Sequence, residues 1–146
     1  MKIGIACDHN GMDLKSKIID YLEKSNYNVV DFGPKKYDSN DDYPDYAFKL
    51  SESIRDKNID YGILICGTGI GMSIAANKVK GVRCAKVNTI KETKLTRIDN
   101  NANVIAFSKD LCFDKIKRII ETFIETPFST LERHHRRVDK ITKYEC

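Results

Sequence analysis

The segment ILICGTGIGMS, residues 63–73, joins a nucleophilic side chain to a glycine-rich turn. An apolar run ends at Cys66, and Gly67, Gly69 and Gly71 follow within five residues. Glycines let the backbone turn tightly and present bare N–H groups at the start of a helix, where negative charge is favoured. A thiolate at Cys66 would gain from the same field. Such a base could remove a proton next to a carbonyl while the N–H groups stabilise the resulting enediolate.

Other uses of this loop fit the residues less well. A cysteine phosphatase would need an arginine six residues after its nucleophile, and Met72 occupies that position. A dinucleotide fingerprint has the spacing G-x-G-x-x-G, whereas these glycines are spaced G-x-G-x-G. For the loop alone, a purely structural turn in which Cys66 only fills space is an equally good interpretation.

A basic cluster lies near the C-terminus, in the sequence ERHHRRVDK. Arg133 and Arg137 are four residues apart, so on a helix they share one face and could hold a phosphate with their forked donors. The alternative interpretation is a solvated basic face. We expect His134 and His135 to be surface or interface residues, since no third metal-ligating partner accompanies them.

The composition is that of an ordinary globular protein, with 41% hydrophobic and 32% charged residues. No apolar stretch of about 18 residues and no signal-peptide pattern is visible, so we expect a cytoplasmic protein. The five cysteines lack C-x-x-C spacing, which argues against a disulfide framework or a zinc site. The net charge of +4 is too small to indicate a nucleic-acid-binding protein.

The elements that must position these residues alternate between strand and helix. β-prone runs predict strands at 3–7, 27–32, 61–65, 82–87 and 104–107. Apolar residues at helical spacing predict helices around 14–22, 47–54, 70–78, 90–99 and 112–123, and a C-terminal one at about 129–144. Parallel neighbours need helical crossovers. We therefore predict one domain over residues 1–146, an α/β protein with a three-layer α/β/α sandwich and a five-stranded, mainly parallel, Rossmann-like sheet. The strand order stays open.

In folds of this class, ligands bind in the crevice beyond the carboxyl ends of the strands. Asp8 and His9 follow the first predicted strand, and the Cys66 loop follows the third. Asp99 and Asn100 lie just ahead of the fifth strand, so their loop would have to reach over to join the other groups.

From end to end, the chain resembles the type B ribose-5-phosphate isomerases and the related galactose-6-phosphate isomerase subunits. The matching segments are IACDHNG at 5–11, DYPDYA at 42–47, GILICGTGIGMSIAANK at 62–78, GVRCA at 81–85, NNANVIAF at 100–107 and RHHRRV at 133–138. The resemblance implies an aldose–ketose isomerase that uses neither metal nor cofactor. It also implies a homodimer or homotetramer in which the active site is shared between subunits.

The resemblance implies a role for each residue of the glycine loop. Cys66 would be the base that moves a proton between C2 and C1 of the sugar. Thr68 would assist in catalysis by holding the enediolate. The backbone of Gly67, Gly69 and Gly71 would bind the sugar oxygens beside it.

Substrate contacts implied by the resemblance come from several other segments. They are Asp8 and His9 on the sugar and phosphate, Tyr43 and Tyr46 in the wall of the substrate pocket, Asn100 on the sugar from the partner chain, and Arg133 and Arg137 as the phosphate clamp. For Tyr43, ordinary packing is an equally good interpretation. The C-terminal helix would contact the partner subunit.

Two positions depart from the family pattern. Asp99 stands where many type B enzymes have a histidine that is thought to open the furanose ring, and a carboxylate is a poorer acid than imidazole at neutral pH. Asp99 could serve as an acid only if burial favours its protonated form, or it could instead accept the anomeric proton. Alternatively, His9, a tyrosine or water opens the ring, or the enzyme takes the open-chain sugar. Asp110 replaces an arginine that helps to bind phosphate in several relatives, and compensation by Lys109 stays open.

The sequence therefore predicts conversion of D-ribose 5-phosphate into D-ribulose 5-phosphate through an enediolate, a step of the pentose phosphate pathway. Retention of Cys66 together with Arg133 and Arg137 favours this substrate. A six-carbon sugar phosphate, allose or galactose 6-phosphate, is the nearest alternative. A catalytically inactive sugar-phosphate-binding protein is the other, and only Asp99 and Asp110 favour it.

Overall fold

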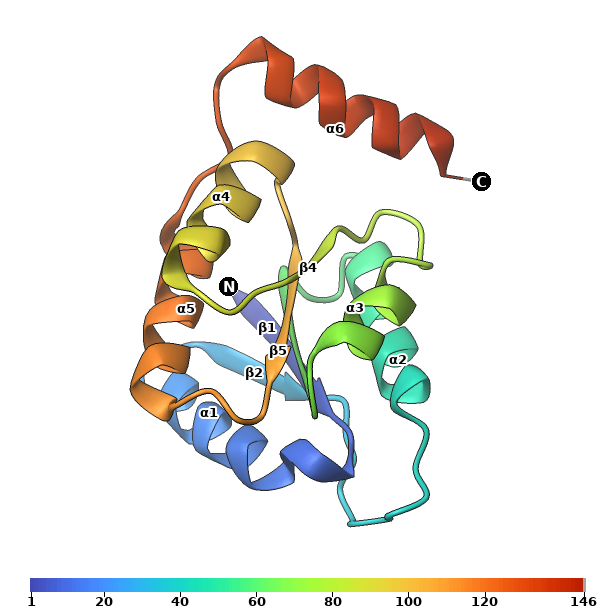
Figure 1. Cartoon of the computed structure of the whole chain (residues 1–146), viewed down its shortest axis with the longest axis vertical. Helices are drawn as coiled ribbons and strands as arrows, with labels where there is room; N and C mark the ends of the chain where they lie inside the picture. Colours follow the sequence, from blue (N-terminus) through green and yellow to red (C-terminus); the bar gives the residue numbers. More distant parts are fainter. Residues whose placement is uncertain (146) are drawn as a thin grey trace.

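A five-stranded sheet, parallel throughout, forms the middle layer of the computed structural model, which describes residues 1–145 (Figure 1). Its strands are β1 (Lys2–Cys7), β2 (Asn28–Asp31), β3 (Tyr61–Cys66), β4 (Cys84–Lys86) and β5 (Val104–Ser108). The order across the sheet is β2-β1-β3-β5-β4. The central strands β1, β3 and β5 are buried on both faces, which explains their continuous apolar sequences.

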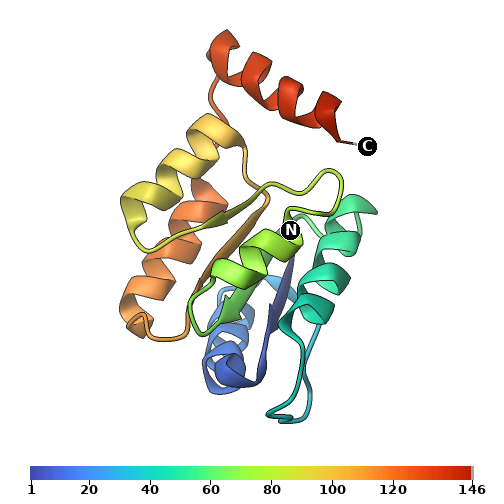
Figure 2. The ribbon, with the colours of Figure 1, turned by 45° about the vertical axis from the view of Figure 1, so that its right-hand side comes forward.

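Helices cover both faces of the sheet and confirm the predicted α/β/α sandwich. They are the single-turn η1 (His9–Gly11), α1 (Met12–Lys24), α2 (Tyr43–Arg55), α3 (Ile70–Ala76), α4 (Ile90–Asn100), α5 (Phe113–Glu125) and α6 (Glu132–Tyr144). On one face, α1 and α5 pack through residues such as Leu22 and Phe123, and α4 lies alongside α5 (Figure 2). On the other face, α2 and α3 pack through residues such as Leu50 and Met72. None of the helices within residues 1–145 has the length and apolar character of a membrane span.

Two predicted boundaries differ from the structure near β4. The strand has three residues instead of the predicted 82–87, and α3 ends at Ala76 instead of residue 78. Both differences involve the side chain of Asn77. Its amide donates to the carbonyl of Cys84 and accepts from the Cys84 N–H, each at 2.8 Å. This side chain therefore ends α3 and pairs with the edge of the sheet.

The chain reverses its direction of winding between β1 and β3. From β1 it continues to β2 on one side, and from β3 it continues toward β4 and β5 on the other. The loops that follow β1 and β3 therefore diverge, and they leave a crevice at their shared carboxyl edge. Cys7 is paired in register with Ile65, so Asp8 and the Cys66 loop begin side by side at this edge.

Helix α6 lies across the opposite end of the molecule, away from the sheet (Figures 1 and 2). At its start, the buried His134 approaches the Ile98 carbonyl of α4, with Nδ1 at 3.2 Å. At its other end, Glu145 accepts a hydrogen bond from the Gly81 N–H at 2.8 Å. The prediction that His134 is a surface residue is wrong, because its ring is buried between α6 and α4. A contact of His134 with another subunit stays a prediction.

A buried lysine fixes the segment that joins β2 to α2. Lys15 is 3% exposed, and its Nζ donates to Asp31 Oδ1 and to the Pro34 carbonyl, both at 2.7 Å. The same Asp31 oxygen accepts from the Gly33 N–H at 2.8 Å. Helix α1 therefore determines where residues 33–42 leave the sheet.

We predict that Lys15→Met lowers the free energy of unfolding by about 2 kcal/mol, because it leaves the Pro34 carbonyl without a donor and the partly buried Asp31 carboxylate without its cation. Lys17→Met, on the exposed side of the same helix, should change stability by less than about 0.5 kcal/mol. Urea unfolding followed by circular dichroism measures both. Equal stability of the two variants would show that the Lys15 contacts contribute nothing.

Candidate active site

The Cys66 sulfur lies inside the turn that follows β3. Cys66 is the last residue of the strand and is 5% exposed. The Gly69 N–H donates to its Sγ at 3.0 Å, so the turn closes around the sulfur. Helix α3, which begins at Ile70, has only seven residues. The field at the sulfur therefore comes mainly from nearby N–H groups, and the contribution of the helix dipole is smaller than the sequence suggested.

Several backbone donors of this turn remain free. The N–H groups of Gly67, Thr68 and Gly71 form no hydrogen bond with any group of residues 1–145. The Thr68 hydroxyl accepts from the Ile70 N–H at 3.2 Å, which holds its side chain at the start of α3. A small cluster of donors thus surrounds a thiol, which is the arrangement predicted for stabilising an oxyanion.

A serine from the neighbouring strand holds the loop in place. Ser108, the last residue of β5, donates through Oγ to the Gly67 carbonyl at 2.7 Å and accepts from the Asp110 N–H at 3.1 Å. Sequence reasoning missed this residue. Its role follows only from the strand order, which makes β5 the neighbour of β3, and the sequence left that order open.

Two glycines of the loop are required by close contacts. Gly69 has φ +82°, and a Cβ there would lie 2.8 Å from the Cα of Phe107. A Cβ at Gly71 would lie 2.6 Å from the ring of Tyr43. The backbone of α3 therefore packs directly on β5 and on the Tyr43 ring, and Tyr43 lies beside the loop as expected for a residue that lines the site.

Asp8 and His9 border the same edge of the sheet. Asp8 is 7% exposed and caps η1, since its Oδ1 accepts from the Asn10 N–H at 2.9 Å. The Asp8 N–H donates to the Ile65 carbonyl at 3.2 Å, which ties this turn to the strand that carries Cys66. His9 follows directly, and its Nδ1 lies 2.6 Å from Asp41 Oδ1.

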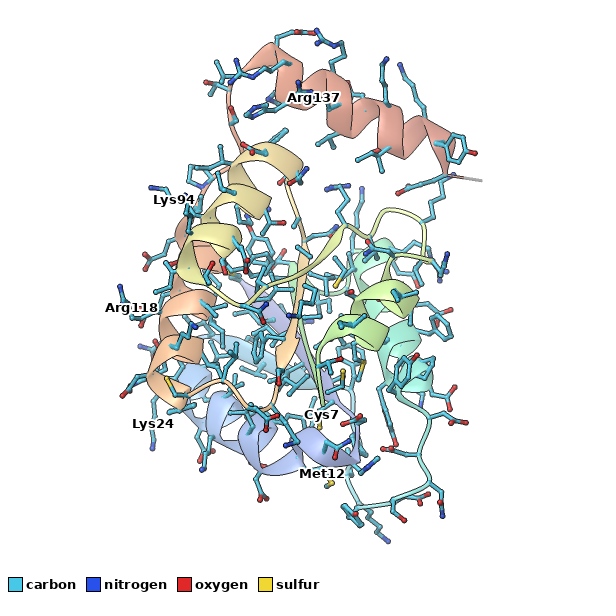
Figure 3. All side chains as sticks on the ribbon, viewed as in Figure 1. Cys7, Met12, Lys24, Lys94, Arg118 and Arg137 are labelled. Carbon is cyan, nitrogen blue, oxygen red and sulfur yellow. The ribbon has the colours of Figure 1, made fainter. Side chains whose placement is uncertain are left out.

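The remaining predicted site residues lie together at the end of the molecule opposite Cys66. Asp99 and Asn100 form the last turn of α4, next to the amino end of β5, and Arg133 and Arg137 are exposed on α6. Figure 3 shows Arg137 at one end of the molecule and Cys7, the strand neighbour of Ile65, toward the other. The loop of Asp99 does not reach over to Cys66 within one chain. The predicted residues therefore form two groups.

Asp110 and Asp99, the two positions predicted to depart from the family pattern, each lie close to a nitrogen-bearing side chain. Lys109 Nζ lies 2.6 Å from Asp110 Oδ1, in an ion pair that is exposed to solvent. Asp99 Oδ1 lies 3.7 Å from Nδ1 of the buried His134. Arg133 Nε lies 3.3 Å from Nε2 of the same ring. The His134 ring therefore lies between the Asp99 carboxylate of α4 and the Arg133 side chain of α6.

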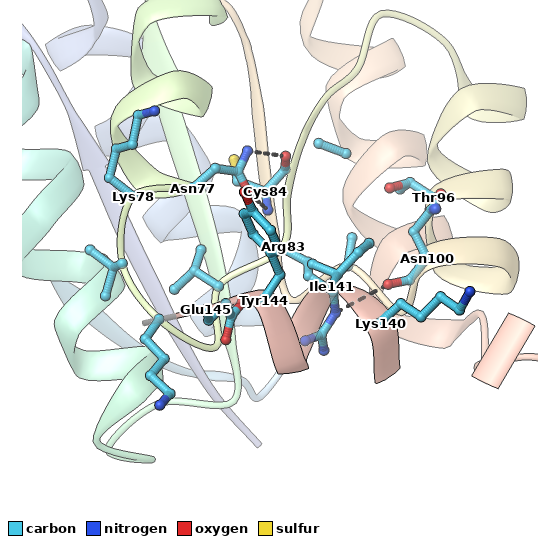
Figure 4. A pocket seen from close by; sticks show the side chains of 15 residues that line it. Asn77, Lys78, Arg83, Cys84, Thr96, Asn100, Lys140, Ile141, Tyr144 and Glu145 are labelled. Atoms are coloured by element: carbon cyan, nitrogen blue, oxygen red, sulfur yellow. Dashed lines mark hydrogen bonds between the residues drawn. The ribbon is translucent and has the colours of Figure 1, made fainter. Parts of the chain in front are cut away.

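The cavity shown in Figure 4, of about 950 Å³, separates α6 from the edge of the sheet. It is lined by the α3–β4 segment, the end of α4 and the second half of α6, including Val79, Asn100 and Ile141. Cys66 is not part of its lining. Within residues 1–145, no three His, Cys, Asp or Glu side chains are grouped as metal ligands.

Known proteins resemble the chain over nearly its whole length. A family model described as Ribose/Galactose Isomerase matches residues 3–141. The Mycoplasma genitalium protein named "Probable ribose-5-phosphate isomerase B" is 46% identical, over 98% of this chain and 95% of that protein. The crystal structure of ribose-5-phosphate isomerase B from Mycoplasma genitalium with bound ribulose-5-phosphate has a TM-score of 0.92 and 45% identity, covering 99% of this chain and 95% of that one. The Clostridium thermocellum ribose-5-phosphate isomerase B structure has a TM-score of 0.93 and 41% identity, covering 99% and 97%.

We predict that Gly69→Ala lowers the free energy of unfolding by about 3 kcal/mol or more, since the new Cβ would strike the Phe107 backbone and strain a positive φ. Gly81→Ala is the matched control, because Gly81 has φ +80° with open space around it. Its cost should be about 1 kcal/mol. Thermal and urea unfolding of both variants measure the difference, and similar costs would show that the Phe107 contact is not tight in solution.

Proposed function

The chain belongs to the ribose/galactose isomerase family, and from this premise we propose that it interconverts D-ribose 5-phosphate and D-ribulose 5-phosphate. The names of its close relatives and the ribulose 5-phosphate bound in the Mycoplasma genitalium structure support this substrate. One observation carries the chemistry. The Cys66 sulfur accepts a backbone hydrogen bond at 3.0 Å within a turn that offers further free N–H groups.

In the proposed mechanism, the Cys66 thiolate removes the proton from C2 of the open-chain aldose. The electron pair of the C2–H bond forms a C1–C2 double bond, and the carbonyl oxygen at C1 becomes an oxyanion. Free N–H groups of the loop, with the Thr68 hydroxyl, stabilise the enediolate. Cys66 then returns the proton to C1 while a proton moves from the C2 hydroxyl to the C1 oxygen, which yields the ketose without net gain or loss of protons.

Ring opening breaks the bond between C1 and the ring oxygen, so it requires a group that accepts the anomeric proton and a donor, such as water, that protonates the ring oxygen. We propose Asp99 as the acceptor, because its carboxylate is partly exposed and lies with Asn100 at the end of α4, in the group of predicted site residues opposite Cys66. Asp99 would then act where many relatives use a histidine. The enzyme would take ribose 5-phosphate in its ring form and would work in the pentose phosphate pathway.

We propose that the complete site forms between two subunits of a homodimer, which can pair further into a tetramer. The group around Cys66 and the group on α4 and α6 lie at opposite ends of one chain, so a two-fold partner is needed to join them. Ile70 and Ile74, next to the Cys66 loop on α3, are 53% and 57% exposed, which fits a contact with another subunit. Arg133 and Arg137 of α6 would then hold the phosphate of a sugar bound at the other subunit's Cys66.

A reducing compartment fits this proposal. Cys7, Cys66, Cys84 and Cys112 are all free thiols, and a thiolate base must stay reduced to act. We therefore propose that the protein works in the cytoplasm.

We predict that Cys66→Ala folds normally and loses about 10³-fold or more in kcat for ribose 5-phosphate, because the variant has no proton carrier. Cys112→Ala removes an exposed thiol and should keep wild-type activity. The assay uses purified protein with ribose, allose and galactose 6-phosphates in parallel. Preference for a six-carbon sugar would identify the alternative substrate class, and no turnover of any sugar would leave a binding protein.

We also predict complementation between two inactive variants. Cys66→Ala lacks the base, and the Arg133→Ala/Arg137→Ala variant lacks the phosphate clamp. Random pairing of equal amounts should restore roughly a quarter of wild-type activity, because half of the dimers carry one intact site of two. Arg136→Ala is the control for the clamp, since Arg136 pairs with Glu132 at 2.8 Å on another side of α6. Activity that stays at the level of the separate variants would place the whole site within one chain.

A further inference from the structure

A buried carboxylate holds the histidine beside the candidate active site. Asp41 comes from the segment between β2 and α2, and its side chain is only 4% exposed. Its Oδ1 lies 2.6 Å from His9 Nδ1, while the His9 side chain is 26% exposed. With Nδ1 occupied, the free ring nitrogen is Nε2, which has no hydrogen-bond partner among residues 1–145.

Asp41 has few other groups that could stabilise its charge. Its second oxygen, Oδ2, is buried and has no hydrogen-bond partner within the described chain. Tyr46 is a neutral neighbour of Asp41: desolvation first, then the Asp41 charge and a hydrogen-bonding contact with Asp41, raise the pKa of the Tyr46 hydroxyl. A buried carboxylate in this situation is stabilised best by a cation next to it, and the imidazolium form of His9 is that cation.

We propose that Asp41 is a positioning residue for substrate binding: it fixes the ring of His9 and keeps it charged, so that Nε2–H donates to the phosphate of the sugar. This inference rests on the proposed function for the identity of the ligand. Asp41 lies outside the segments that carry the family resemblance, and no pattern in the sequence singles it out.

The charges around His9 agree with this assignment. The hydrogen bond to Asp41 raises the pKa of His9 above 6.5, desolvation opposes it, and the charges of Asp41, Asp8 and Asp38 raise it further. Tyr37 contacts the ring edge-on, with centroids 5.8 Å apart, and adds no charge. Because the folded-state pKa is raised, the imidazolium persists to a higher pH than in a free histidine.

A histidine cation has a particular use in this chain. Asp110 occupies the position of a phosphate-binding arginine of several relatives, and Lys109 is paired with Asp110 at 2.6 Å. The half of the site that contains Cys66 therefore has a carboxylate at position 110, where those relatives have a cation. A charged His9 would supply one from its own subunit, and charge-assisted donors are the strong partners of phosphate oxygens.

The test compares Asp41→Asn with the wild-type protein by two measurements. The first is KM for ribose 5-phosphate between about pH 5.5 and pH 8.5. We expect the ratio of the two KM values to be near one at the acidic end and to rise to about tenfold near neutral pH, where the variant's His9 loses its proton. The ionisation of the substrate phosphate is common to both proteins and cancels in the ratio.

The second measurement is an NMR titration of the three histidines, with and without inorganic phosphate as the probe. In the wild-type protein, phosphate should shift the His9 resonance, and the His9 midpoint should lie at higher pH than in Asp41→Asn. Asp38→Asn is the matched control, because it removes one charge from the same segment without touching the ring. Because the Asp38 charge contributes less to the pKa of His9 than the contacts with Asp41, this variant should lower the His9 midpoint much less than Asp41→Asn does and should leave the KM profile close to wild type.

Three outcomes would overturn the proposal. A KM ratio that is the same at every pH would indicate a folding or loop defect in Asp41→Asn. A His9 titration midpoint that is the same in Asp41→Asn and the wild-type protein would show that Asp41 does not control the charge of the ring. A His9 resonance that does not shift when phosphate is added would show that the ring does not bind phosphate. Wild-type protein that fails to isomerise ribose 5-phosphate would contradict the proposed function instead, and the titration would still decide the role of Asp41.

Discussion

The packing of Gly69 against the backbone of Phe107 determines the geometry around Cys66. Because no side chain intervenes, the turn after β3 can lie directly on β5, and its N–H reaches the Cys66 sulfur at 3.0 Å. Ser108 holds the other side of the turn through the Gly67 carbonyl. The donors are thus fixed before any ligand arrives, which is what makes backbone groups effective at stabilising a developing charge.

A second set of contacts fixes the opposite wall of the same crevice. Lys15 anchors residues 33–34 on α1, and the segment then carries Asp41 to His9 and Tyr43 to Gly71. One wall of the site is therefore held by strand β5 and the other by helix α1. A ligand between these walls would contact groups whose positions depend both on the sheet and on the packing of α1.

The sequence predicted the sandwich, the parallel sheet and the group around Cys66, because apolar periodicity and glycine spacing are local signals. It did not predict Ser108 or Asp41. Ser108 matters only because β5 neighbours β3, and Asp41 only because residues 33–42 fold back on η1. The burial of His134 was not predicted either, because the sequence of a basic helix does not show that one of its rings packs against Ile98. Long-range topology decides all three.

The parallel sheet also explains why the predicted site residues form two groups at opposite ends of one chain. Loops that follow the strands lie at the carboxyl edge with Cys66, whereas α4 ends at the amino end of β5 and brings Asp99 and Asn100 to the opposite end. Helix α6 begins beside α4 and places Arg133 and Arg137 there as well. The two departures from the family pattern therefore fall in different halves of the proposed shared site, Asp99 with the arginines and Asp110 with Cys66. In such a site, a charge lost beside Cys66 can be replaced from the same subunit, and the buried Asp41 under His9 provides the means.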